Sequence, residues 1–148
     1  MIHTIPHYLA ISPTLATSGQ PRAEHFTWIQ QAGYKTVINL APVDSGYSLI
    51  NEADLVTEQG MDYVYIPVIW ENPTLENFAT FVQAIEARKE QKKWVHCAMN
   101  MRVSAFIYLY NCLYNKMSEA EAKIKLETIW TPNKVWQNYI NNVFQKGI

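Results

Sequence analysis

The chain has 148 residues, of which 49% are hydrophobic and 17% are charged, and its formal net charge is -1 at pH 7. These values predict one globular domain spanning residues 1–148 and exclude a disordered chain. The near-zero net charge argues against nucleic acid or an anionic membrane as a partner.

The cysteine content predicts a chain without disulfides, metal or cofactor. Cys97 and Cys112 are the only two cysteines, too few for a secreted disulfide framework, and no Cys/His cluster has the spacing of a zinc site. Residues 1–19 lack the basic start and apolar core of a signal peptide, and no apolar run approaches the roughly 18 residues of a membrane span. We therefore expect a cytoplasmic protein.

Short β-rich stretches alternate with helical stretches along the chain. Pro13 divides the first β-rich stretch, Gly33 is suited to end the first helix, and Ser118 with Glu121 is typical of a helix start. The expected strands are residues 8–18 (one or two), 35–40, 62–68 and 93–97. The expected helices are residues 21–32, 49–59, 73–90 and 104–114, one that begins after Ser118, and one that carries the apolar stripe from Val135 to Phe144.

This alternation predicts an α/β fold with a mainly parallel sheet of four to five strands and helices on its two faces. Ligands of such sheets bind beyond the carboxyl ends of the strands. Cys97 comes at the end of the strand 93–97, and a loop and an apolar helix follow it. We therefore expect an anion site at this loop, whereas Cys112 lies inside the apolar helix and is expected to be a core residue.

The loop sequence Val-His-Cys-Ala-Met-Asn-Met-Arg-Val-Ser, residues 95–104, contains the groups that such a site needs. Loop amides, a helix N-terminus and an arginine hold a phosphate. The same surroundings lower the pKa of a cysteine from about 8.5 to about 3.5–7.5, which makes a nucleophilic thiolate. The expected roles are Cys97 as nucleophile, Arg102 as phosphate ligand, Ser104 as the group that helps the thiolate leave, His96 as loop support, and Ala98, Met99, Asn100, Met101 and Arg102 as the phosphate-binding loop.

These residues resemble the signature of cysteine-based tyrosine and dual-specificity phosphatases. More specifically, the chain resembles a bacterial family, the beta-lactamase hydrolase-like phosphatases, over roughly residues 18–114. Thr-Ser-Gly-Gln-Pro at 17–21 is similar to the opening motif of that family, residues 33–40 to its first central strand, and Ile-Pro-Val at 66–68 to the next. The resemblance implies the phosphatase fold, a cysteinyl-phosphate intermediate, and a phosphorylated protein or small molecule as the substrate.

The loop departs from the phosphatase pattern in its spacing. That pattern has five residues between Cys and Arg and a hydroxyl residue directly after Arg, whereas four residues separate Cys97 from Arg102 and Val103 precedes Ser104. If Ser104 keeps its place, Arg102 comes one position early, about 100° around a helix. Asn100 then stands where many such loops carry glycine, and asparagine tolerates the left-handed backbone. If Arg102 keeps its place, the loop is one residue shorter and loses an amide.

This spacing supports two alternative functions. Four residues between Cys and Arg resembles the loop of rhodanese-type sulfurtransferases, in which Cys97 would carry a persulfide. The early arginine and the two loop methionines, Met99 and Met101, are also consistent with a module that binds an anion or a partner without turnover.

The general acid also differs from the family pattern. The resemblance implies an arginine at position 41 and an aspartate in the loop after the strand 62–68. Ala41 occupies the first position, and Glu71 is the only carboxylate in the loop, beside Trp70. We expect Glu71 to be the general acid if burial raises its pKa, with Asp44 as a second candidate.

Overall fold

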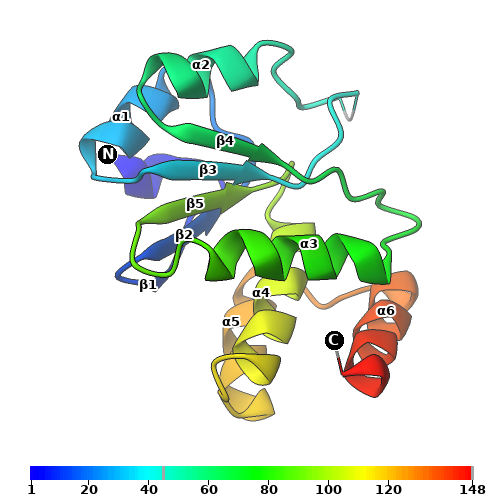
Figure 1. Ribbon diagram of the computed structural model, residues 1–148. Helices are drawn as coiled ribbons and strands as arrows, with labels where there is room; N and C mark the ends of the chain where they lie inside the picture. Colours follow the sequence, from blue (N-terminus) through cyan, green and yellow to red (C-terminus); the bar gives the residue numbers. More distant parts are fainter. Residues whose placement is uncertain (45, 148) are drawn as a thin grey trace.

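The computed structural model describes residues 1–44 and 46–147. Its centre is a five-stranded sheet in the order β1-β2-β5-β3-β4 (Figure 1). β1 (Leu9–Ser12) and β2 (Leu15–Ser18) are antiparallel, whereas β5 (Lys93–His96), β3 (Thr36–Asn39) and β4 (Asp62–Tyr65) continue the sheet as parallel strands from β2. The predicted α/β class with a mainly parallel sheet is therefore confirmed.

Helices cover both faces of this sheet (Figure 1). One face carries η1 (Ile2–Thr4), α1 (His25–Gln31) and α2 (Glu52–Glu58). The other carries α3 (Leu75–Glu86) and α4 (Met101–Leu113), with α5 (Glu119–Ile129) and α6 (Lys134–Lys146) packed beside α4. None of the helices within the described ranges is long and apolar enough to cross a membrane.

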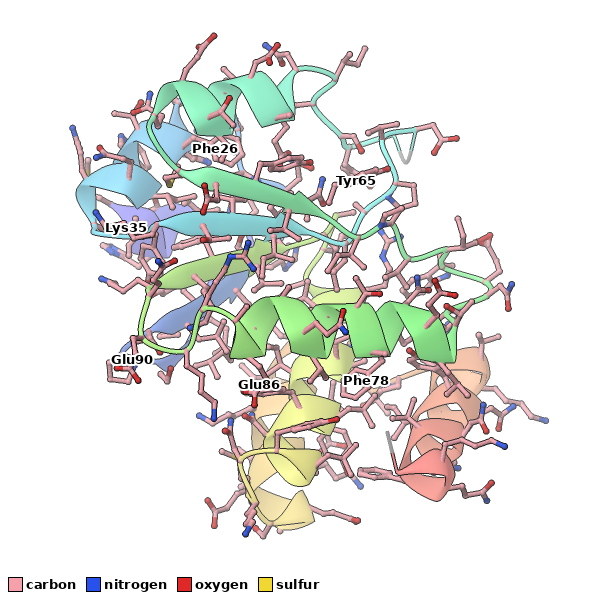
Figure 2. The ribbon with its side chains drawn as sticks, viewed as in Figure 1. Phe26, Lys35, Tyr65, Phe78, Glu86 and Glu90 are labelled. Atoms are coloured by element: carbon pink, nitrogen blue, oxygen red, sulfur yellow. The ribbon has the colours of Figure 1, made fainter. Side chains whose placement is uncertain are left out.

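Two hydrophobic clusters lie on opposite faces of the sheet. Val37 and Trp94 belong to the cluster under α1 and α2, and their chain neighbours Ile38 and Val95 belong to the cluster under α3 and α4. Figure 2 shows Phe26 in the first layer and Phe78 on the lower side of α3. Because successive strand side chains point to opposite faces, neighbouring residues of one strand belong to different clusters, and every residue of β2, β3 and β5 is buried.

Several element boundaries differ from the sequence-based expectations. α2 begins at Glu52 rather than at residue 49, and α3 ends at Glu86 rather than near residue 90. α1 begins at His25 rather than near residue 21, and β4 ends at Tyr65. The backbone hydrogen bonds nevertheless continue beyond β4: Ile66 N–H donates to the carbonyl of Asn39, the last residue of β3, and Val68 N–H donates to the Leu40 carbonyl, at 2.9 Å each. α4 begins at Met101, three residues before the expected start. The left-handed backbone of Asn100 turns the chain there, and the Asn100 carbonyl accepts the Ser104 N–H at 2.9 Å, which closes the first turn early.

The strand register brings the cysteine loop to the middle of one sheet edge. His96, the last residue of β5, lies between Ser18 of β2 and Asn39 of β3. The carboxyl ends of these three parallel strands therefore meet where Cys97 leaves the sheet, at the position where ligands of such sheets bind.

Candidate active site

A cavity of about 500 Å³ opens at this edge of the sheet. The chain segments that follow β3, β4 and β5 form its wall. Cys97 lines the cavity and is only 1% exposed, so it lies at the buried end of the cavity wall. The lining residues are Pro42, Asp44, Tyr47, Ile69, Trp70, Glu71, Cys97, Ala98, Met99, Met101 and Arg102.

Asn100 holds the cysteine loop in its turned shape. Its φ of 63° is left-handed, which fits the alternative in which Ser104 keeps its place and Asn100 stands at the glycine position. Its buried side-chain amide donates to the His7 carbonyl at 2.8 Å and to the Thr17 hydroxyl at 3.0 Å. Asn100 therefore adopts the turn as glycine would. In addition, its side chain ties the loop to β2 and the amino-terminal segment, which glycine cannot do.

The helix that follows the loop supplies donors for an anion. Met101, Arg102 and Val103 open α4, and the first amides of a helix have no carbonyl partner within the helix. With the helix dipole, these amides favour a negative group at the start of α4.

Arg102 lines the same cavity as Cys97 despite its early position in the sequence. Its guanidinium donates through Nη1 to the Val68 carbonyl at 2.9 Å and lies 5.9 Å from the centre of the Trp70 ring. These contacts fix one side of the guanidinium and leave its other N–H groups for a ligand. The one-residue shift in sequence therefore does not remove the arginine from the cavity that Cys97 lines.

Two carboxylates also line the cavity. Glu71 comes from the segment after β4 and Asp44 from the segment after β3, and both residues are exposed to solvent. Both candidates for the general acid thus line the same cavity as Cys97, but neither is buried, so the burial on which the role of Glu71 was conditional is not found. Ala41, where the family pattern has arginine, is fully buried, and Arg102 is the one cation among the described residues that line the cavity.

Ser104 lies away from the cavity lining. Its hydroxyl donates to the Met101 carbonyl at 3.0 Å, within the first turn of α4. It lines a second, very small cavity together with Thr17 instead. Met99 and Met101 do line the main cavity, and Met99 is 39% exposed at its rim. The expected site residues that line the main cavity are Cys97, Ala98, Met99, Met101, Arg102 and Glu71. Ser104, the buried Asn100 and the supporting His96 do not line it.

His96 has a buried partner that the sequence analysis missed. Its Nε2 lies 2.5 Å from a carboxylate oxygen of Glu52, and its Nδ1 lies 3.2 Å from the Cys97 carbonyl. His96 is fully buried and Glu52 is 2% exposed. In the sequence, Glu52 looks like an ordinary acidic residue at a helix start, where carboxylates are favoured, so no signal distinguished it.

The chemistry of the site suits an anion held by backbone amides and arginine beside a nucleophile. Within residues 1–44 and 46–147, no group of three or more His, Cys, Asp or Glu side chains is arranged to hold a metal ion. Both cysteines are free thiols.

Comparison with known proteins gives one matching family. Residues 11–140 match the family described as "DSP-PTPase phosphatase fused to NAD+ Kinase". A "Beta-lactamase hydrolase-like protein" from Xylella fastidiosa (strain Temecula1 / ATCC 700964) is 29% identical over 116 residues. That alignment covers 76% of this chain but 27% of the relative, so the chain spans about a quarter of the length of the curated relatives it matches.

Solved structures share the whole fold. A DUF442 protein from Shewanella putrefaciens CN-32 is 36% identical, with a TM-score of 0.88, and the match covers 98% of this chain and 95% of that chain. Tk-PTP in its active form has a TM-score of 0.81 at 17% identity, with 95% of this chain and 98% of that chain covered. At that identity the second likeness concerns the fold alone.

Proposed function

Because this chain belongs to the family of DSP-PTPase phosphatases fused to NAD+ kinase, we propose that it hydrolyses phosphate monoesters with Cys97 as the nucleophile. Its membership confirms the predicted resemblance to tyrosine and dual-specificity phosphatases and to beta-lactamase hydrolase-like proteins. The observation that carries the proposal is that Cys97 and Arg102 line one cavity at the start of α4.

The proposed reaction has two steps. The Cys97 thiolate attacks phosphorus, an S–P bond forms, and the ester P–O bond breaks while Glu71 gives its proton to the leaving oxygen. Water then attacks phosphorus, Glu71 takes a proton from that water, and the S–P bond breaks to release inorganic phosphate and the thiolate. Arg102 and the amides of the loop stabilise the charge that the phosphoryl oxygens carry in both transition states.

The cavity lining favours a substrate with one phosphate and an apolar remainder. Ile69, Trp70 and Met99 offer apolar contacts, whereas the carboxylate of Asp44 repels a second anionic group. TpbA from P. aeruginosa, which shares this fold at 15% identity, was crystallised with pTyr, an aromatic monoester. A cytoplasmic setting suits the proposed reaction, because a reducing compartment keeps a reactive cysteine as a thiol.

The test is hydrolysis of para-nitrophenyl phosphate and of fructose 1,6-bisphosphate by the full chain between pH 5 and 8. We expect turnover of the aryl ester, with kcat/KM at least about tenfold above that of the bisphosphate, or about 1.4 kcal/mol. A folded protein without turnover contradicts the proposal. In that case, sulfur added to Cys97 after thiosulfate treatment indicates a sulfurtransferase, and phosphate binding alone indicates a binding module.

A further inference from the structure

Glu52 connects three parts of the chain beneath the cysteine loop. One of its oxygens meets His96 Nε2 at 2.5 Å, and the other accepts a hydrogen bond from the Gln20 side-chain amide at 2.7 Å. Gln20 lies in the turn after β2, His96 ends β5, and Glu52 begins α2. Burying a carboxylate costs free energy unless its oxygens have hydrogen-bond partners, and here each oxygen of Glu52 has one.

The same two partners also hold two carbonyls of the cysteine loop. A carbonyl oxygen only accepts, so His96 Nδ1 donates to the Cys97 carbonyl at 3.2 Å. The Gln20 backbone N–H donates to the Ala98 carbonyl at 3.0 Å. Glu52 thus fixes the two residues that bind the first two carbonyls of the loop.

The direction of these carbonyls determines the direction of two amides. In a trans peptide unit the C=O of one residue and the N–H of the next point in opposite directions. The carbonyls of Cys97 and Ala98 are directed to His96 and Gln20, outside the loop. The N–H groups of Ala98 and Met99 consequently point to the other side, and both of these residues line the cavity.

The hydrogen-bond roles place one shared proton between Glu52 and His96. Since Nδ1 carries a hydrogen, the short contact at Nε2 needs one more proton, on either the imidazole or the carboxyl group. Tyr63 also faces Glu52, and burial, with the negative charge of Glu52 as a second cause, raises the pKa of Tyr63 to about 12. Tyr63 therefore stays a neutral phenol at the pH of an assay.

We infer that Glu52 is a positioning residue for the proposed phosphatase reaction, acting through His96 and Gln20 on the anion-binding amides of the loop. The inference rests on the proposed function for its catalytic consequence, but its effect on anion binding is separate. The reach of the side chain matters in this arrangement, rather than its charge. A glutamine at 52 can donate to His96 Nε2 and accept from Gln20, whereas an aspartate is one methylene too short to reach both.

The test compares Glu52→Asp with Glu52→Gln in the full chain. For Glu52→Asp we expect the Kd of inorganic phosphate, measured by titration calorimetry, to rise by about tenfold to a hundredfold. We expect kcat/KM for para-nitrophenyl phosphate to fall by a similar factor. Glu52→Gln should stay within a few-fold of the wild type in both measurements. A Glu52→Asp variant that matches the wild type, or a Glu52→Gln variant that loses as much as Glu52→Asp, overturns the inference.

Tyr110→Phe is a matched control for lost stability. Tyr110 is buried on the opposite face of the sheet and donates to Glu86 at 2.5 Å. We expect its removal to lower Tm and leave the Kd of phosphate unchanged, and a weaker phosphate affinity in Tyr110→Phe overturns a specific role for Glu52. Loss of phosphate binding in Glu52→Asp without turnover in the wild type supports the positioning role and contradicts the phosphatase. If the wild type turns over and both Glu52 variants keep its phosphate affinity and activity, the phosphatase is supported and the positioning role is contradicted.

Discussion

Replacing Cys97 by serine is expected to lower kcat/KM for an aryl phosphate by at least about a thousandfold, because removal of a nucleophile has effects of this size or larger. Serine keeps the shape of the side chain, but its hydroxyl is a weak nucleophile without an adjacent base. The side chain is 1% exposed and packed in the core beside the cavity, so the small change in size should leave the fold intact. The measurement is steady-state hydrolysis beside titration with inorganic phosphate.

Phosphate affinity and a second cysteine provide the controls for this variant. Arg102 and the loop amides are unchanged in Cys97→Ser, so the Kd of phosphate should stay within a few-fold of the wild type. Cys112 lies at the far end of α4, and burial raises the pKa of its thiol, which keeps it protonated and unreactive. Cys112→Ser should retain full activity. Turnover that persists in Cys97→Ser, or disappears in Cys112→Ser, contradicts the assignment.

Replacing Arg102 by lysine is expected to lower kcat/KM by about a hundredfold to a thousandfold, the usual effect of losing a preorganised donor to the transition state. Lysine keeps the positive charge but not the planar fork, which binds two oxygens at once. It also cannot hold the Val68 carbonyl and meet a phosphate in the same way as the guanidinium. The measurement is kcat and KM together with the Kd of inorganic phosphate, which should rise.

The matched control for Arg102→Lys is Arg22→Lys. Arg22 forms an exposed ion pair with Glu24, and the Arg22 side chain is 69% exposed, so its loss should not change activity. If Arg102→Lys keeps kcat/KM and phosphate affinity within a few-fold, a guanidinium is not required. The early arginine would then be a structural residue that only binds Val68 and packs on Trp70.

Local signals in the sequence were sufficient to predict the strands, the layers and the cysteine loop. The short β-rich stretch at β3 and the position of Cys97 directly after β5 are both visible in short-range sequence patterns, and the fold keeps them. The left-handed backbone at Asn100 was also expected, because asparagine is one of the few residues that tolerate it. Whether Arg102 reaches the cavity was not decidable from spacing, since it depends on where α4 begins.

Long-range partners were beyond the reach of the sequence. Glu52 and His96 are 44 residues apart, and the Asn100 amide binds His7 across 93 residues. The carboxylate of Glu52 looked solvated in the sequence because acidic residues are common at helix starts. Ser104 gave the opposite case: its place after the arginine suggested a chemical role, but its hydroxyl binds the Met101 carbonyl in the helix.

In the proposed reaction, Cys97 carries the phosphoryl group during turnover. The most direct measurement is acid quenching of the wild-type protein during hydrolysis of para-nitrophenyl phosphate, followed by peptide mass spectrometry. We expect one phosphoryl group on the peptide that contains Cys97, and none on that peptide in Cys97→Ser. Turnover with no phosphoryl group on Cys97, under conditions that trap one on a known cysteine phosphatase, would contradict it.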